Sequence, residues 1–90
     1  MRILVIEDNP KMARLLAKGL SEQGYSVEVA NTGRDGEDVA AAGGFDLVIL
    51  DVMLPDTDGV SVCRNLRHRG VVTPIAMLTA LSSTSDKIAG

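Results

Sequence analysis

The sequence predicts an α/β fold with a parallel sheet, and three observations support this prediction. Short apolar runs, typical of strands, alternate along the chain with stretches of helical periodicity. The alternation continues through the whole chain, as in sheets whose strands are joined by right-handed crossovers. Two of the apolar runs end directly in acidic residues. With 90 residues, the chain forms one domain at most.

The first predicted strand and helix occupy the N-terminal quarter of the chain. Residues 3–6 (ILVI) are apolar on both faces, which is typical of a buried strand. Asn9 can cap the following helix, Pro10 suits its first position, and Gly24 suits its end. One apolar stripe is expected to face the core, made of Met12, Leu15, Leu16 and Leu20.

The second strand and helix carry weaker signals. Residues 25–29 alternate apolar and polar side chains, which indicates a strand with one solvated face and therefore an edge strand. A second helix is expected within residues 31–44, with Val39 and Ala40 on its inner side and a glycine pair at its end.

The second half of the chain repeats the alternation. Residues 45–50 (FDLVIL) predict a third buried strand. Asp58 is a good N-cap for a third helix over about residues 59–69. Residues 74–79 (PIAMLT) predict a fourth strand, and residues 81–90 look like a loop and the first turn of a fourth helix. The apolar side of the third helix is made of Val62, Cys63 and Leu66.

Composition narrows the classes of function. The chain is 46% hydrophobic with a net charge of −3, which argues against non-specific binding of nucleic acid. Its only cysteine, Cys63, rules out an internal disulfide and weakly favours a reducing compartment. The N-terminal apolar run of residues 3–6 is too short for a signal peptide or a membrane span. A cytoplasmic location is predicted.

The acidic residues at the strand ends predict a metal site. Glu7 and Asp8 follow the first strand, and Asp51 follows the third. If these strands are neighbours, about 4.8 Å apart, the three carboxylates converge at one edge of the sheet. Like charges repel there, and Mg²⁺ would resolve the conflict. Asp51 could then act as a nucleophile and become an aspartyl-phosphate, with the Thr79 hydroxyl donating to a phosphate oxygen.

Three segments carry a resemblance to a known family. ILVIEDN, DLVILDVMLPDTDG and PIAMLTA resemble, in order and spacing, the signature segments of the response-regulator receiver domain. The resemblance covers the whole chain. The stretches KMARLLAKGLSEQGYSVEVA and SDKIAG are most similar to receivers that carry a winged-helix DNA-binding domain.

The resemblance implies a fold and a set of roles. The fold is a flavodoxin-like, doubly wound parallel sheet of strand order 2-1-3-4-5. Asp51 would accept a phosphoryl group from a phosphohistidine on a sensor histidine kinase. Glu7, Asp8 and Asp51 would bind Mg²⁺, together with the backbone carbonyl of Met53. Thr79 would be the switch residue that moves toward the phosphate. Pro55 and Gly59 would shape the loop after Asp51.

One departure concerns the end of the family pattern. Residues 1–90 supply only the order 2-1-3-4, so the fifth strand and fifth helix are missing, with their lysine and aromatic residue. Lys87 lies too early to be that lysine. The fourth strand is apolar on both faces and guarded only by Pro74, as in a strand that lacks a neighbour. We expect an incomplete receiver that self-associates through this open edge and the uncovered side of the first helix, with impaired switching.

Other interpretations of these residues are weaker. Asp56 and Asp58 are more typical of turn and cap residues than of metal ligands. A Mg²⁺-dependent phosphohydrolase with an aspartate nucleophile usually needs a second acid two residues later, where this chain has Met53. A purely structural fragment is a further alternative. His68 is expected to be solvated, and Cys63 is expected to pack in the core.

Overall fold

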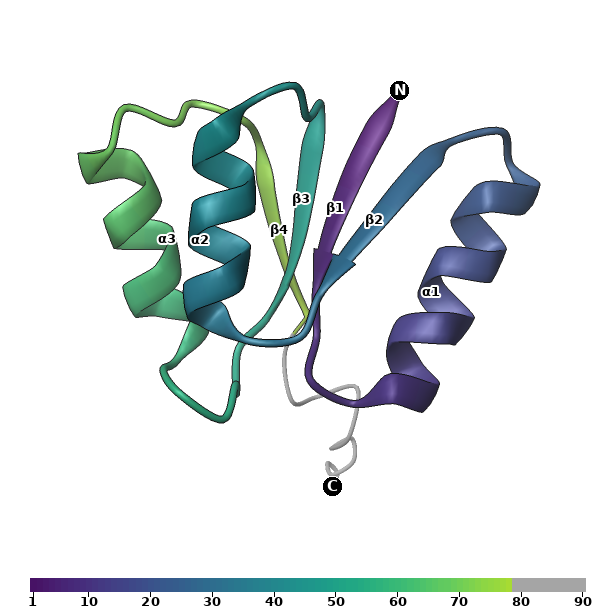
Figure 1. Cartoon of the computed structure of the whole chain (residues 1–90), viewed down its shortest axis with the longest axis horizontal. Coiled ribbons are helices and arrows are strands. Elements are labelled where there is room, and N and C mark those ends of the chain that lie inside the picture. Colours follow the sequence, from purple (N-terminus) through teal and green to yellow (C-terminus); the bar gives the residue numbers. More distant parts are fainter. Residues whose placement is uncertain (79–90) are drawn as a thin grey trace.

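The computed structural model describes residues 1–78, and these form one sheet with helices on both faces (Figure 1). The sheet has four parallel strands in the order β2-β1-β3-β4, which confirms the predicted order. Helices α2 and α3 cover one face of the sheet and α1 covers the other (Figure 1). The elements are β1 (Arg2–Ile6), α1 (Pro10–Glu22), β2 (Ser26–Ala30), α2 (Gly33–Ala42), β3 (Leu47–Asp51), α3 (Gly59–His68) and β4 (Ile75–Leu78).

The central position of β1 follows from its side chains. Four consecutive apolar residues, Ile3 to Ile6, are at most 1% exposed, so both faces of the strand are buried. The strand pairs with β2 on one side and β3 on the other, with Val5 opposite Val29 and Ile49. Because β1 and β3 are parallel neighbours, the residues that end them lie at the same edge of the sheet.

The main core lies between the sheet and helices α2 and α3. Its buried members are Leu4, Ile6, Ala30, Ala40, Val48, Leu50, Val62 and Leu66. Glycine lets α2 approach the sheet closely, because a Cβ at Gly36 would meet the side chain of Ile6. The glycines that lower the helical propensity of this segment therefore serve its packing.

The ends of the helices match their predicted capping residues. Asn9 Oδ1 accepts hydrogen bonds from the backbone N–H groups of Lys11 and Met12 at 3.0 and 3.1 Å. At the other end of α1, Gly24 has φ +94°. Its N–H donates to Ser21 O, and the following N–H of Tyr25 donates to Leu20 O. This is a Schellman motif, which glycine favours because it tolerates positive φ.

The predicted inward stripe of α1 is wrong for two of its residues. Met12 is 39% exposed and Leu15 is 65% exposed, whereas the buried residue of this helix is Ala13. Among residues 1–78, α1 contacts only β1 and β2 closely, so no other element covers the flank that carries these two side chains. Helical periodicity finds an apolar stripe correctly, but it cannot show how much of that stripe the neighbouring elements cover.

Strands β2 and β4 form the two edges of the sheet in the described part of the chain. The edge position of β2 was expected, and Val29, one of its apolar residues, is 41% exposed. Strand β4 pairs only with β3 among residues 1–78, and its Met77 is 41% exposed. Thr79 and the predicted loop and helix turn over residues 81–90 lie outside the described residues.

Strand β3 begins two residues later than predicted, at Leu47. At Asp46 the backbone N–H still donates to Arg2 O at 2.8 Å, whereas the Arg2 N–H donates to the Asp46 carboxylate, also at 2.8 Å, instead of to a backbone carbonyl. None of the helices in residues 1–78 combines the length and apolar character needed to cross a membrane.

Candidate functional site

Three carboxylates meet where β1 and β3 end. Glu7 and Asp8 directly follow β1, and Asp51 is the last residue of β3. One carboxylate oxygen from each of the three residues lies within 4.8 Å of the others. Glu7 is buried, Asp51 is half-buried and Asp8 is exposed, so the acidic cluster of Glu7, Asp8 and Asp51 opens to solvent on one side.

Glu7 is an unusual residue to bury. It is 5% exposed, and neither of the two ion pairs in residues 1–78 involves it. Burial is the main cause that raises the pKa of its carboxyl to about 7, with smaller contributions from the hydrogen bond and charge of Asp51 and from Asp8. The Asn9 N–H, which donates to Glu7 Oε2 at 3.1 Å, acts in the opposite direction. A buried acid without a cationic partner is a group that a bound cation would stabilise.

Two contacts from the β2 side hold Glu7 in place. The Glu7 N–H donates to Ala30 O at 2.9 Å, which continues the pairing of β1 with β2. The Asn31 side-chain amide donates to the Glu7 carbonyl at 3.2 Å. Asn31 was not singled out from the sequence, and an asparagine after a strand is too common to be a signal by itself.

Asp51 is held by the loop that follows it. The Met53 N–H donates to Asp51 Oδ1 at 3.2 Å. Met53 is bridged to Asp58 in antiparallel fashion, and the hydrogen bonds of that bridge are made by the flanking residues, Leu54 to Thr57 and Gly59 to Val52. In such a pair, the N–H and C=O of Met53 point away from Asp58. The Met53 N–H points to the Asp51 carboxylate, and the role of the Met53 carbonyl as a metal ligand stays a prediction.

The start of α3 packs directly against the end of β3. The Gly59 N–H donates to Val52 O at 2.6 Å. A Cβ at Gly59 would lie 2.7 Å from the backbone oxygen of Asp51 and 2.9 Å from Val52 Cα. Glycine is therefore required here by the close approach of two backbone segments.

Asp56 and Asp58, the other acids of this loop, do not belong to the acidic cluster found in residues 1–78. Asp58 caps α3, as predicted, because its Oδ1 accepts from the Ser61 N–H at 2.7 Å. Asp56 also caps a helix, but that helix is α2: its two oxygens accept from the N–H groups of Gly33 and Arg34. These hydrogen bonds lower the pKa values of both carboxyls.

The remaining candidates have simpler environments. Cys63 is half-buried and packs against the main core, as predicted. His68 is exposed in the last turn of α3, which agrees with a solvated side chain. Thr79 lies outside the described residues, so its predicted place beside Asp51 stays a prediction.

The sheet order and the acidic cluster at its carboxyl edge define a class of protein, the receiver domains of two-component signalling. Residues 3–90 match the family model of the response regulator receiver domain, and the chain belongs to this family.

The curated relatives that this receiver resembles are transcriptional regulators. The chain is 49% identical over its whole length to the transcriptional regulatory protein TcrA of Mycobacterium tuberculosis, of which it covers 36%. It is 46% identical over 99% of its length to the transcriptional regulatory protein PcoR of Escherichia coli, of which it covers 39%. The chain thus spans well under half the length of these relatives. Their class agrees with the predicted similarity to receivers of winged-helix regulators.

Solved structures agree with the fold. The receiver domain of Francisella response regulator 1452 has a TM-score of 0.84 at 32% identity, and the match covers 98% of this chain and 73% of that one. The response regulator TrrA of Thermotoga maritima, solved in complex with Mg²⁺-BeF, has a TM-score of 0.83 at 37% identity, over 94% of this chain and 75% of that one. TrrA was also solved in complex with the histidine kinase ThkA, with a TM-score of 0.81 over 88% of this chain and 68% of that one.

Proposed function

We propose that this chain is a phosphoacceptor module, in which Asp51 takes a phosphoryl group from a phosphohistidine of a sensor histidine kinase in the presence of Mg²⁺. The observation that carries the proposal is the acidic cluster, whose three carboxylates lie within 4.8 Å of one another at one edge of the sheet. The proposal makes the chain a switch module and not an enzyme that turns over a substrate.

The donor set of the acidic cluster fits Mg²⁺. This ion prefers oxygen ligands, and carboxylates with a backbone carbonyl supply them. Glu7, Asp8 and Asp51 would hold the ion together with the Met53 carbonyl. When bound, Mg²⁺ would offset negative charge on the transferring phosphoryl group. Glu7 is buried and has no cationic partner among residues 1–78, a feature that a purely structural role leaves unexplained.

Asp51 is the acid best placed to act as the nucleophile. Its Oδ1 is bound by the Met53 N–H, which orients the carboxylate. One of its oxygens attacks the phosphorus of phosphohistidine, an O–P bond forms, and the P–N bond breaks. The electron pair of the broken bond goes to the imidazole nitrogen. In this proposal, the Thr79 hydroxyl donates to an oxygen of the transferred group.

Two solved structures of one neighbour, TrrA, support the assignment. TrrA, 37% identical in the matched region, was solved with Mg²⁺-BeF and also with the histidine kinase ThkA. A cation and a kinase are therefore recorded for a protein with the same fold. The cognate kinase of this chain would be a protein of the same class.

Replacing Asp51 by asparagine is expected to abolish incorporation of phosphate from acetyl phosphate in the presence of Mg²⁺, because the amide is not a nucleophile. Intact-protein mass spectrometry measures the incorporation. Asp38→Asn is the matched control, since Asp38 forms an exposed ion pair with Arg69 away from the acidic cluster, and it should retain incorporation. Incorporation that persisted in Asp51→Asn would reject the proposal. Turnover of a generic phosphate ester would instead favour the phosphohydrolase.

We also propose that the 90-residue chain self-associates through β4. In residues 1–78 the outer edge of β4 carries no partner strand, and Met77 is 41% exposed. Exposed edges of this kind pair readily with another chain. Light scattering after size-exclusion chromatography should show an oligomer, and Ala76→Lys should shift it toward the monomer. A well-folded wild-type monomer at high concentration would contradict the proposal.

We further propose impaired switching in the 90-residue chain, a cytoplasmic location and no direct contact with nucleic acid.

A further inference from the structure

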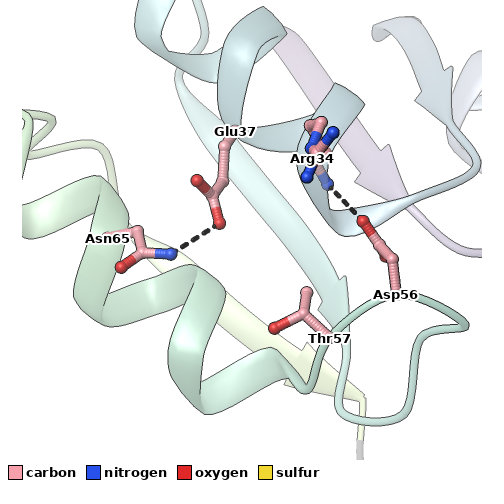
Figure 2. A pocket seen from close by; sticks show the side chains of 5 residues that line it. All are labelled: Arg34, Glu37, Asp56, Thr57 and Asn65. Carbon is pink, nitrogen blue, oxygen red and sulfur yellow. Dashed lines mark hydrogen bonds between the residues drawn. The ribbon is translucent and has the colours of Figure 1, made fainter.

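The loop between β3 and α3 is attached to a helix that is distant in sequence. Asp56 Oδ1 accepts from the Gly33 N–H at 2.8 Å, and its Oδ2 accepts from the Arg34 N–H at 3.0 Å. Figure 2 shows Asp56 reaching from the loop to the first turn of α2. Both oxygens of one carboxylate are thus used on two consecutive amides of α2.

These two hydrogen bonds are additional to the ordinary cap of α2. Thr32 is the N-cap, and its Oγ1 accepts from the Asp35 N–H at 3.1 Å. The Thr32 carbonyl accepts from the Gly36 N–H at 3.0 Å. The loop therefore supplies the acceptors for the two N–H groups that the local sequence leaves free. The interaction also places a negative charge at the positive end of the helix dipole, and it lowers the pKa of Asp56.

Packing matches the hydrogen bonds. Gly33 is buried, and a Cβ added there would meet the Thr57 Cγ2 methyl, with Val62 Cγ2 at 3.0 Å and Asp56 Oδ1 at 3.3 Å. The side chain of Thr57 thus lies directly against the helix backbone. A larger residue at Gly33 would push the tip of the loop away from α2.

The tip of the loop is mechanically connected to the acidic cluster. The Met53–Asp58 bridge and the Leu54-to-Thr57 hydrogen bond make residues 53–58 a compact turn. One end of this turn holds the Asp51 carboxylate through the Met53 N–H. The other end leads into α3 at Gly59. Because the turn is short and internally bonded, a shift of its tip changes the direction of the Met53 peptide.

A second contact joins α2 and α3 beside the same loop. The Asn65 side-chain amide donates to Glu37 Oε2 at 2.9 Å across a polar cleft of about 230 Å³ (Figure 2). The cleft is lined by Arg34, Glu37, Asp56, Thr57 and Asn65. The loop is therefore fixed to α2, and α2 is fixed to α3.

We propose that Asp56 is a positioning residue, which anchors the loop over residues 52–58 to the first turn of α2 and thereby sets the direction of the Met53 peptide at the acidic cluster. The effect of this anchor on Mg²⁺ binding rests on the proposed function. The effect of the anchor on the position of the loop is independent of the proposed function.

The test compares Asp56→Asn with Asp58→Asn in the 90-residue chain. Both variants remove one charge from the same loop, but asparagine still serves as the N-cap of α3 at position 58. Asp56→Asn is expected to speed hydrogen exchange at the Leu54 and Gly59 amides. It should also raise the Kd for Mg²⁺ about tenfold, as replacing a residue that positions a metal ligand typically does. Asp58→Asn should leave both readouts near wild type.

A second pair of variants tests the contact without removing a charge. Gly33→Ala should loosen the same amides, because its methyl group displaces Thr57. Gly33→Ala combined with Thr57→Ser, which lacks the Cγ2 methyl, should restore part of the slow exchange, because Val62 Cγ2 still lies 3.0 Å from the new Cβ. A merely structural loss of stability would not be reversed by removing one more methyl group.

The outcomes separate this inference from the proposed function. Equal exchange in the Asp56→Asn and Asp58→Asn variants, or no rescue of Gly33→Ala by Thr57→Ser, overturns the positioning role. If wild type binds no Mg²⁺ while Asp56→Asn still loosens the loop, the proposed function fails and the positioning of the loop stands. If the loop loosens but the Kd for Mg²⁺ is unchanged, the link from the loop to the metal is wrong.

Discussion

Replacing Glu7 by glutamine is expected to make the Mg²⁺-free protein more stable and to weaken its binding of Mg²⁺. Glu7 is buried beside Asp51 and Asp8 without a cationic partner among residues 1–78. Glutamine keeps the size of the side chain and removes the repulsion. We expect the free energy of unfolding at neutral pH and above to rise by about 1–3 kcal/mol in the presence of a chelator.

The effect should depend on pH in a defined direction. The pKa of Glu7 rises from an ordinary value of 4.5 to about 7 in the fold, so between these values the folded state holds a proton that the unfolded state releases. Stability of the Mg²⁺-free wild type should therefore fall as the pH rises from about 4.5 to about 7, and Glu7 should add no further loss above that range. Glu7→Gln should remove this part of the pH dependence.

Chemical denaturation with and without Mg²⁺ measures both parts of this prediction. Mg²⁺ should stabilise wild type by mass action and should stabilise Glu7→Gln much less. Glu22→Gln is the control, because Glu22 is exposed at the end of α1, and it should change stability by less than about 0.5 kcal/mol. A Glu7→Gln variant that is less stable than wild type in chelator, and equally stabilised by Mg²⁺, would show that Glu7 is only a structural residue.

Replacing Gly59 by alanine is expected to disrupt the fold and the site together. The new Cβ would lie 2.7 Å from the Asp51 backbone oxygen and 2.9 Å from Val52 Cα. Backbone atoms cannot rotate away as a side chain can, so α3 must shift from the end of β3. We expect a loss of about 2 kcal/mol or more in the free energy of unfolding, together with a large drop in phosphate incorporation.

Gly19→Ala is the control for this substitution. Gly19 lies inside α1, and nothing lies within 4 Å of a Cβ added there. Alanine should stabilise the helix by about 0.5–1 kcal/mol. Thermal unfolding of the two variants should move in opposite directions. Equal effects would mean that the close approach of Gly59 to Asp51 is not what requires a glycine.

The meeting of the three acids was predictable because it depends on topology alone. In a parallel sheet the carboxyl ends of all strands share one edge, so acids after two neighbouring strands must come close. The caps of Asn9 and Asp58 were predictable for a similar reason, since a cap acts on amides two or three residues away.

Features that depend on distant packing could not be predicted in this way. Asp56 resembles a local turn residue in the sequence, but its partners are the Gly33 and Arg34 amides, 23 and 22 residues away. The exposure of Leu15 depends on which elements lie beside α1, and helical periodicity does not contain that information. The contact of Asn31 with the Glu7 carbonyl likewise requires that β2 and β1 be neighbours.

Glu7, Asp8 and Asp51 are proposed to bind Mg²⁺ together, with Asp51 as the carboxylate that is phosphorylated. The most direct test is a Mg²⁺ titration of the 90-residue chain followed through its backbone amide NMR signals. We expect saturable changes concentrated at residues 7–9 and 51–54, and their loss in Asp51→Asn. Changes of equal size at the exposed acids Glu22 and Asp35, or none at residues 7–9, would contradict it.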